Sequence, residues 1–99
     1  MNNKINIVLY NAQSILNKIF DINEYIGKNK IDVFCINETF LNNNTTNINL
    51  IKNYSIIRND RLTHGGGVAI IINKQLKFKI IKQKSTLDYE YQVIEVFSK

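Results

Sequence analysis

The spacing of apolar residues along the 99-residue chain changes from segment to segment, and each spacing predicts a different element. An isoleucine recurs at steps of four, three and four, which predicts one apolar face of an amphipathic helix. The residues with this spacing are Ile15, Ile19, Ile22 and Ile26. Ser14 precedes them as a candidate N-cap and Gly27 follows them as a candidate stop, so the helix is expected between these two residues.

Two strand-like segments flank this helix. Ile5–Tyr10 is rich in β-branched and aromatic residues, as strands are. Ile31–Phe40 begins as a continuous apolar run, which is typical of a strand covered on both faces at the centre of an α/β sheet. Strand, helix and strand in this order predict a βαβ unit whose two strands are parallel and whose crossover is right-handed.

The rest of the chain predicts antiparallel strands. After a loop at Leu41–Asn53, Tyr54–Arg58 and Val68–Ile72 are expected to form a hairpin with a long tip. In Leu76–Ile81 lysines alternate with apolar residues, so one face of this strand should be buried and the other polar. The polar face has an ordinary interpretation as solvated surface. Glu90–Phe97 is the last predicted strand.

These elements predict an α/β fold in which a sheet of about six strands is covered by one helix. A single helix covers one face of a sheet, so the other face should remain largely open. Either a second copy of the chain covers that face in a homodimer, or the remainder of a larger domain does.

Composition narrows the class of protein. No apolar run approaches the roughly 20 residues of a membrane span, and we expect no secretory signal and no membrane partner. The single cysteine, Cys35, excludes an internal disulfide and favours an intracellular, reducing compartment. The formal net charge of +5 favours a polyanionic partner, although a compositional bias towards Asn, Ile and Lys would produce the same charge.

Two polar side chains stand where the predicted parallel strands end. Asn11 follows the first strand and Glu38 follows the second, so both should lie on the same edge of the sheet, where open α/β sheets usually bind ligands. A carboxylate that leaves the core at this point must be solvated, paired or bound to a cation. A solvated acid is the ordinary interpretation of Glu38, and a metal ligand is the functional one.

Other common sites do not fit the pattern. One histidine and one cysteine cannot form a zinc cluster. Residues 65–67 are three glycines that lack the Lys-Ser/Thr pair and the helix of a Walker phosphate loop. We interpret them as structural, because glycine permits positive φ and close approach of another backbone. His64, next to them, is expected to be an exposed turn residue.

Three segments occur together in an order and spacing that resemble a known family: Asn11–Ser14 after a strand, Ile31–Thr39 after a helix, and Arg58–Arg61 followed by Gly65–Ile70. The chain resembles the N-terminal half of an endonuclease/exonuclease/phosphatase domain. More narrowly, it is similar to the apurinic-type endonuclease domain of non-LTR (LINE, jockey-like) retrotransposons. The resemblance covers nearly the whole chain, so we interpret residues 1–99 as one partial domain.

The resemblance implies a two-sheet α/β sandwich that hydrolyses phosphodiester bonds of DNA with Mg²⁺, or with Mn²⁺ in its place. By position, Glu38 would be the metal-binding glutamate and Asn11 the active-site asparagine, and both would be catalytic. Arg58 and Arg61 would contact phosphates, unless Asp60 or a strand-end carbonyl pairs with them internally. The location would be nuclear if the chain belongs to a retrotransposon protein.

The resemblance also implies limited activity. The family's other catalytic residues are a tyrosine, an Asp-x-Asn pair and a late aspartate–histidine pair, and none has a counterpart in these 99 residues. The second sheet is expected to be missing as well, so we expect a fragment that is inactive alone. Two alternatives remain open: a non-catalytic basic module that dimerises or binds nucleic acid by charge, and a phosphatase-type member of the superfamily. The segment Asp60–Gly67 favours the retrotransposon branch over the second alternative.

Overall fold

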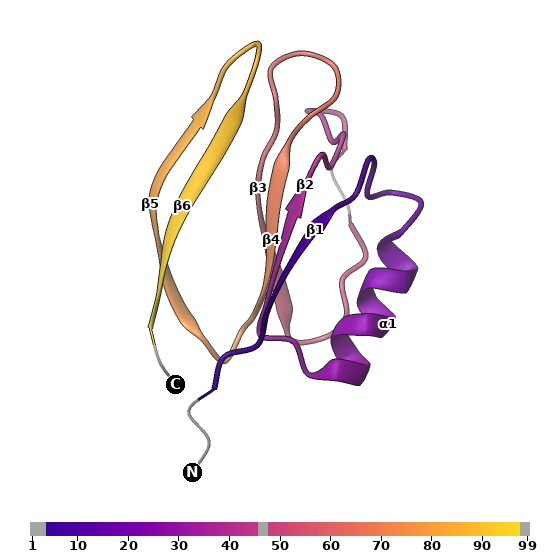
Figure 1. The fold of residues 1–99 in the computed structure, drawn as a ribbon, viewed down its shortest axis with the longest axis vertical. Coiled ribbons are helices and arrows are strands. Elements are labelled where there is room, and N and C mark those ends of the chain that lie inside the picture. The colour runs from indigo at the N-terminus through magenta and orange to yellow at the C-terminus, as the bar shows by residue number, and fades with distance from the viewer. Residues whose placement is uncertain (1–3, 46–47, 98–99) are drawn as a thin grey trace.

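One helix and two β-sheets form three layers in the computed structural model, which describes residues 4–45 and 48–97 (Figure 1). The middle layer is a four-stranded sheet with the strand order β1-β2-β4-β3. The helix α1 covers one face of this sheet, and the two-stranded β5-β6 hairpin lies over part of the other. The chain is therefore a small α/β fold, which is the class that the sequence predicts, and its strands are divided between two sheets.

The strands lie close to their predicted positions. The central sheet contains β1 (Ile7–Asn11), β2 (Val33–Asn37), β3 (Tyr54–Asn59) and β4 (Val68–Asn73). The hairpin contains β5 (Lys77–Ser85) and β6 (Glu90–Phe97). β1 and β2 are parallel, whereas β4 pairs antiparallel with β2 and with β3. The predicted parallel pair and the predicted β3-β4 hairpin are both confirmed.

The helix α1 (Ile19–Asn29) begins and ends later than the sequence predicts. Ser14 has a φ of +89°, and its N–H donates to the carbonyl of Glu38 at 2.9 Å. It therefore belongs to the turn after β1, and the prediction that it caps the helix is wrong, because an N-cap residue has a β-region backbone. The helix instead starts after Lys18 and ends at Asn29, and Lys30 caps its C-terminal end with a left-handed φ of +50°.

Gly27 lies inside the helix, so its predicted role as a stop is also wrong. A Cβ at this position would lie 2.9 Å from Cδ1 of Ile51, and the glycine therefore lets the loop before β3 pack against the helix. Asn23 secures the same loop: its side-chain amide donates to the carbonyl of Asn49 (2.7 Å) and accepts from the N–H of Ile51 (3.0 Å). The loop predicted at 41–53 is present, apart from residues 46 and 47, which lie outside the described residues.

The main core lies between the helix and the central sheet. Its buried side chains come from α1, from β2 and β4, and from the segments that follow β1 and β2. They include Ile15, Ile22, Ile26, Phe34, Ile36, Leu41 and Ile71. The predicted apolar stripe is confirmed for Ile22 and Ile26, which are buried in α1, and in part for Ile19, which is partly buried. Ile15 is buried in the same core but lies in the segment before the helix. No helix within the described residues is long and apolar enough to cross a membrane.

The expectation of one six-stranded sheet with an open face is wrong, and so is the expectation that the second sheet is missing. β5 and β6 leave the central sheet and pack across β3 and β4. Ile94 and Val96 of β6 contact a second buried cluster there, formed by Val33, Ile57, Ile70, Ile72 and Leu76. The cover does not reach β1, where Ile7 is 60% and Leu9 80% exposed.

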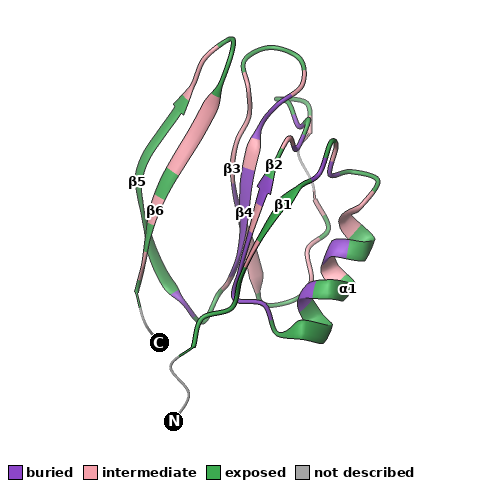
Figure 2. Ribbon diagram, viewed as in Figure 1, coloured by how far each residue is buried: buried purple, intermediate pink, exposed green. Residues whose placement is uncertain are grey.

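The buried face predicted for β5 is only partly covered. Phe78 is 37% and Ile80 45% exposed, and almost every residue of the strand is exposed (Figure 2). A two-stranded layer is too narrow to bury both its own apolar residues and those of a four-stranded sheet. The alternation along the sequence indicates which side chains of β5 share a face. It does not indicate how deeply they are buried, because that depends on the width of the sheet against which they pack.

Candidate functional site

The ends of β1 and β2, where Asn11 and Glu38 were predicted to lie together, are at one edge of the central sheet. We call this edge the rim. Asn11 lies opposite Asn37 in the parallel pair, Asn37 lies opposite Val68, and Val68 lies opposite Asn59. Glu38 follows Asn37 directly. The tips of the β3-β4 and β5-β6 hairpins lie at the same end of the molecule, at the top of Figure 1. The predicted proximity of Asn11 and Glu38 along the backbone is therefore confirmed.

The backbone of the rim adopts unusual conformations. Six non-glycine residues in the described chain have a positive φ, and four of them lie here: Gln13, Ser14, Glu38 and Phe40. Glu38 has a φ of +55°, a region that costs a residue with a side chain roughly 1–2 kcal/mol. Such strain persists only where the surroundings impose it, and it clusters at functional sites.

Hydrogen bonds across the rim impose these conformations. The N–H of Thr39 donates to the carbonyl of Gly67 (3.2 Å), and the N–H of Phe40 donates to that of Gly66 (2.8 Å). Thr39 is completely buried, and a Cβ at Gly67 would lie 2.3 Å from its Oγ1. With a φ of +90° as well, Gly67 has two reasons to be glycine, so the structural interpretation of the triple glycine is confirmed.

The turn after β1 is held by a lysine. The Nζ of Lys18 donates to the carbonyls of Ala12, Gln13 (3.2 Å) and Ser14 (3.2 Å). The N–H of Ile15 donates to the carbonyl of Thr39 (3.0 Å), which ties this turn to the end of β2. The segments that carry Asn11 and Glu38 are thus bonded to each other beyond the strands themselves.

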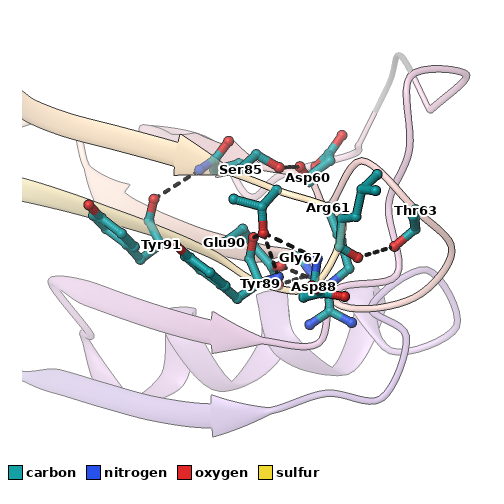
Figure 3. Close-up of polar contacts among 12 residues, drawn as sticks. Asp60, Arg61, Thr63, Gly67, Ser85, Asp88, Tyr89, Glu90 and Tyr91 are labelled. Carbon is teal, nitrogen blue, oxygen red and sulfur yellow. Dashed lines mark hydrogen bonds and ion pairs between the residues drawn. The ribbon is translucent and has the colours of Figure 1, made fainter.

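Glu90, which no sequence motif indicates, is the most enclosed acid of the rim. Its side chain is 5% exposed, and its Oε2 accepts from Nε of Arg61 at 2.9 Å. Its Oε1 accepts from the N–H of Gly67, so one carboxylate joins β6 to the β3-β4 loop (Figure 3). No local pattern reveals this pair, because its members are 29 residues apart.

Arg58 is engaged inside the protein. Its guanidinium donates twice to the carboxylate of Asp60, at 2.7 and 3.2 Å, and also to the carbonyls of Asn42 (3.0 Å) and Thr45 (2.8 Å). The alternative of internal pairing, rather than phosphate contact, is what the structure shows for this residue. Arg61 pairs with Glu90 through Nε alone and keeps 29% of its side chain exposed, so phosphate contact by Arg61 stays a prediction.

Glu38 differs from Asp32 and Glu90, two other acids near the ends of the central sheet, in the partners of its carboxylate. At the opposite end, the buried carboxylate of Asp32 accepts from the N–H of Asn6 at 2.9 Å. Burial raises the pKa of the nearby Tyr54 hydroxyl, and the charge of Asp32 raises it further. Glu38 is half-buried, yet across residues 4–45 and 48–97 its carboxylate has no hydrogen bond and no ion pair.

The side chains at the rim supply only the smallest number of ligands with which a hard cation binds to a protein. Mg²⁺ binds through one or two carboxylates, retains several waters and often contacts substrate phosphates. Glu38 supplies one carboxylate, and Asn11 and Asn37 end the flanking strands with amides. No group of three His, Cys, Asp or Glu side chains gathers into a metal site within the described residues. A complete cage is therefore not present in that part of the chain.

A groove of about 280 Å³ opens between the central sheet and β6, just below the rim. Its walls include Cys35, Asn37, Glu90, Tyr91 and Gln92. Burial raises the pKa of the Cys35 thiol, so this cysteine remains a neutral and weakly reactive group. His64 is exposed in the β3-β4 loop, as predicted.

The chain matches no protein-family model, and no curated protein is significantly similar to it.

Proposed function

We propose that the rim is the cation-binding half of a phosphodiesterase site of the endonuclease/exonuclease/phosphatase type, with DNA as its substrate. One observation carries the proposal: Glu38 is a half-buried carboxylate in a strained conformation with no partner among the described residues. Its neighbour Glu90 is fully engaged by Arg61 and Gly67. An acid that is held in this way without a protein partner is suited to bind a cation.

The roles at the rim follow from side-chain chemistry. Glu38 would hold Mg²⁺, or Mn²⁺ in its place, and the amide of Asn11 would donate a hydrogen bond to a phosphate oxygen. When bound, such a cation neutralises negative charge on the phosphate group. Arg61 keeps part of its guanidinium exposed and would add a second positive contact.

The residues that usually move protons in this family have no counterpart in the 99 residues of the chain. General acid–base catalysis contributes typically about 10²–10⁴-fold, most often through histidine. The only histidine, His64, is exposed in the β3-β4 loop. We therefore propose that the chain binds the cation and the phosphate but does not turn over by itself.

Binding of Mn²⁺ tests the proposal directly, because the free ion is measured by its electron paramagnetic resonance signal. The chain should bind one Mn²⁺, and Glu38→Gln should weaken that binding by at least about tenfold, since it removes the only available charge on the ligand set. Glu95→Gln is the matched control, because it removes an exposed carboxylate from the hairpin. Equal weakening by both variants would contradict a site at the rim.

A plasmid-nicking assay tests whether the chain is inactive as an endonuclease. Incubation of supercoiled plasmid with the chain and Mg²⁺ should produce no nicked circles above the blank. Mg²⁺-dependent nicking that disappears in Glu38→Ala would show that the chain is an active endonuclease. A second candidate function is metal-independent binding of nucleic acid by a basic module, and the exposed lysines of β5 favour it.

A further inference from the structure

The outer face of the β5-β6 hairpin carries an alignment of lysines that depends on a β-bulge. Ile80 lies opposite Ile94, and Lys82 lies opposite Val93, so Ile81 is an extra residue in β5. In a regular strand, residues an odd number apart point to opposite faces. Because of this extra residue, the even-numbered residues after Ile81 lie on the face that the odd-numbered residues occupy before it.

The reversal places four lysines on one face. The register pairs them with residues of β6 that all have odd numbers and therefore share one face: Lys77 with Phe97, Lys79 with Glu95, Lys82 with Val93 and Lys84 with Tyr91. The other face packs towards the central sheet, because it carries Ile94 and Val96. The lysine face is therefore the outer surface of the molecule, on the side away from α1 (Figure 1).

This outer face is basic and largely free of internal pairing. All four lysines are exposed, and none of them forms an ion pair within residues 4–45 and 48–97. Glu95 is the one acid that the register places among them. Four positive charges against one negative charge give the hairpin a surface complementary to a polyanion.

Aromatic rings lie among the lysines. Tyr91 is partly buried on the same face, Tyr89 is 48% exposed at the turn, and Phe97 is 45% exposed at the other end. The Nζ of Lys82 lies 5.9 Å from the centre of the Tyr91 ring, and that of Lys84 lies 5.9 Å from the Tyr89 ring. Lysines that follow a backbone, with rings on which bases stack, are the combination that binds single-stranded nucleic acid.

We propose that the outer face of the β5-β6 hairpin binds single-stranded nucleic acid, with the four lysines on its phosphates and Tyr91 and Phe97 against its bases. A single strand is favoured over a duplex because only unpaired bases offer their faces to these rings. The surface uses neither Glu38 nor a metal. It is therefore independent of the proposed cation site, and either proposal can fail without the other.

Fluorescence anisotropy of a labelled 12-nucleotide oligothymidine, measured in EDTA over a salt series, tests the surface. Lys82→Gln/Lys84→Gln should lower the slope of log affinity against log salt by about 1.4, since each phosphate contact on a single strand contributes about 0.7. The matched control is Lys28→Gln/Lys52→Gln. It removes the same charge from exposed lysines of α1 and of the turn before β3, and should leave the slope unchanged.

Stacking is tested separately from charge. Tyr91→Ala should weaken binding by about fivefold or more, whereas loss of a ring from a purely electrostatic surface would leave the affinity unchanged. An oligouridine of the same length distinguishes RNA from DNA as the preferred strand, and either preference supports the proposal. Far-UV circular dichroism checks that every variant remains folded.

Several results would overturn the proposal. One is an equal loss of affinity in Lys82→Gln/Lys84→Gln and in the control Lys28→Gln/Lys52→Gln, which would show that binding depends only on net charge. Another is binding of duplex DNA, polyglutamate or anionic vesicles as tightly as the single strand, together with no effect of Tyr91→Ala. Absence of binding to the oligothymidine at low salt would also overturn it.

Discussion

The two faces of the central sheet are both apolar, yet they are covered by different means. Ile71 and Ile72 are neighbours in β4, both are 0% exposed, and they belong to the clusters on opposite faces. Ile71 packs in the cluster covered by the stripe of α1 and by Leu41. Ile72 packs in a smaller cluster, to which the hairpin contributes two partly buried residues, Ile94 and Val96.

Polar contacts compensate for the thin apolar cover on the hairpin side. The side-chain amide of Asn59 donates to the carbonyls of Lys84 (2.7 Å) and Tyr91 (2.9 Å). The amide of Gln92 donates to the carbonyl of Ile57 at 3.0 Å, and the Glu90 carboxylate engages the β3-β4 loop. Directional contacts of this kind set the position of the hairpin, while the larger cluster of buried apolar residues lies on the helix side.

Truncation of the two adjacent isoleucines should separate the faces most clearly. Ile71→Ala should lower the free energy of unfolding by about 4 kcal/mol, because the surrounding helix and sheet cannot close around the cavity. Ile72→Ala should cost about 2.5 kcal/mol, because the hairpin can shift inwards. Urea unfolding followed by circular dichroism measures both. A larger cost at Ile72 would mean that the hairpin is as rigid a cover as the helix.

Removal of the buried carboxylate should release the hairpin while the helix side stays intact. Glu90→Ala leaves Arg61 and the N–H of Gly67 without their acceptor and should cost about 2 kcal/mol. Amide hydrogen exchange should accelerate in β5 and β6 more than in β2 and β4. Glu95→Ala, on the exposed outer face, is the control and should change neither quantity. Uniform acceleration across both sheets would show that the two faces unfold as one unit.

The fold features that the sequence predicts are those that follow from local pattern and from the order of the elements. Periodicity predicts the βαβ unit and the shared edge of Asn11 and Glu38, because parallel pairing follows from strand–helix–strand order. The cap signals at Ser14 and Gly27 failed, since backbone bonds to Glu38 and contact with Ile51 determine those positions. Contacts between segments distant in the chain override local preference at both residues.

Three other features of the fold differ in how far the local sequence indicates them. Alternation in β5 and β6 does not specify which strands they pair with, so the division into two sheets could not be predicted. The Arg61–Glu90 pair depends on that division. The bulge did have a signal: the adjacent Ile80 and Ile81 separate two lysine alternations of opposite phase.

The uncovered part of the hairpin-side face should matter least to the stability of the single chain. Leu9 is 80% exposed on β1, so Leu9→Ser should change the free energy of unfolding by less than about 0.5 kcal/mol. Urea unfolding at two protein concentrations tests whether a second copy covers this strip, because dimerisation makes the apparent stability depend on concentration. We expect no such dependence, since the hairpin already covers β3 and β4 and leaves only a narrow strip around Ile7 and Leu9. A concentration dependence that Leu9→Ser abolishes would instead show that the thin side of the sheet is completed by another molecule.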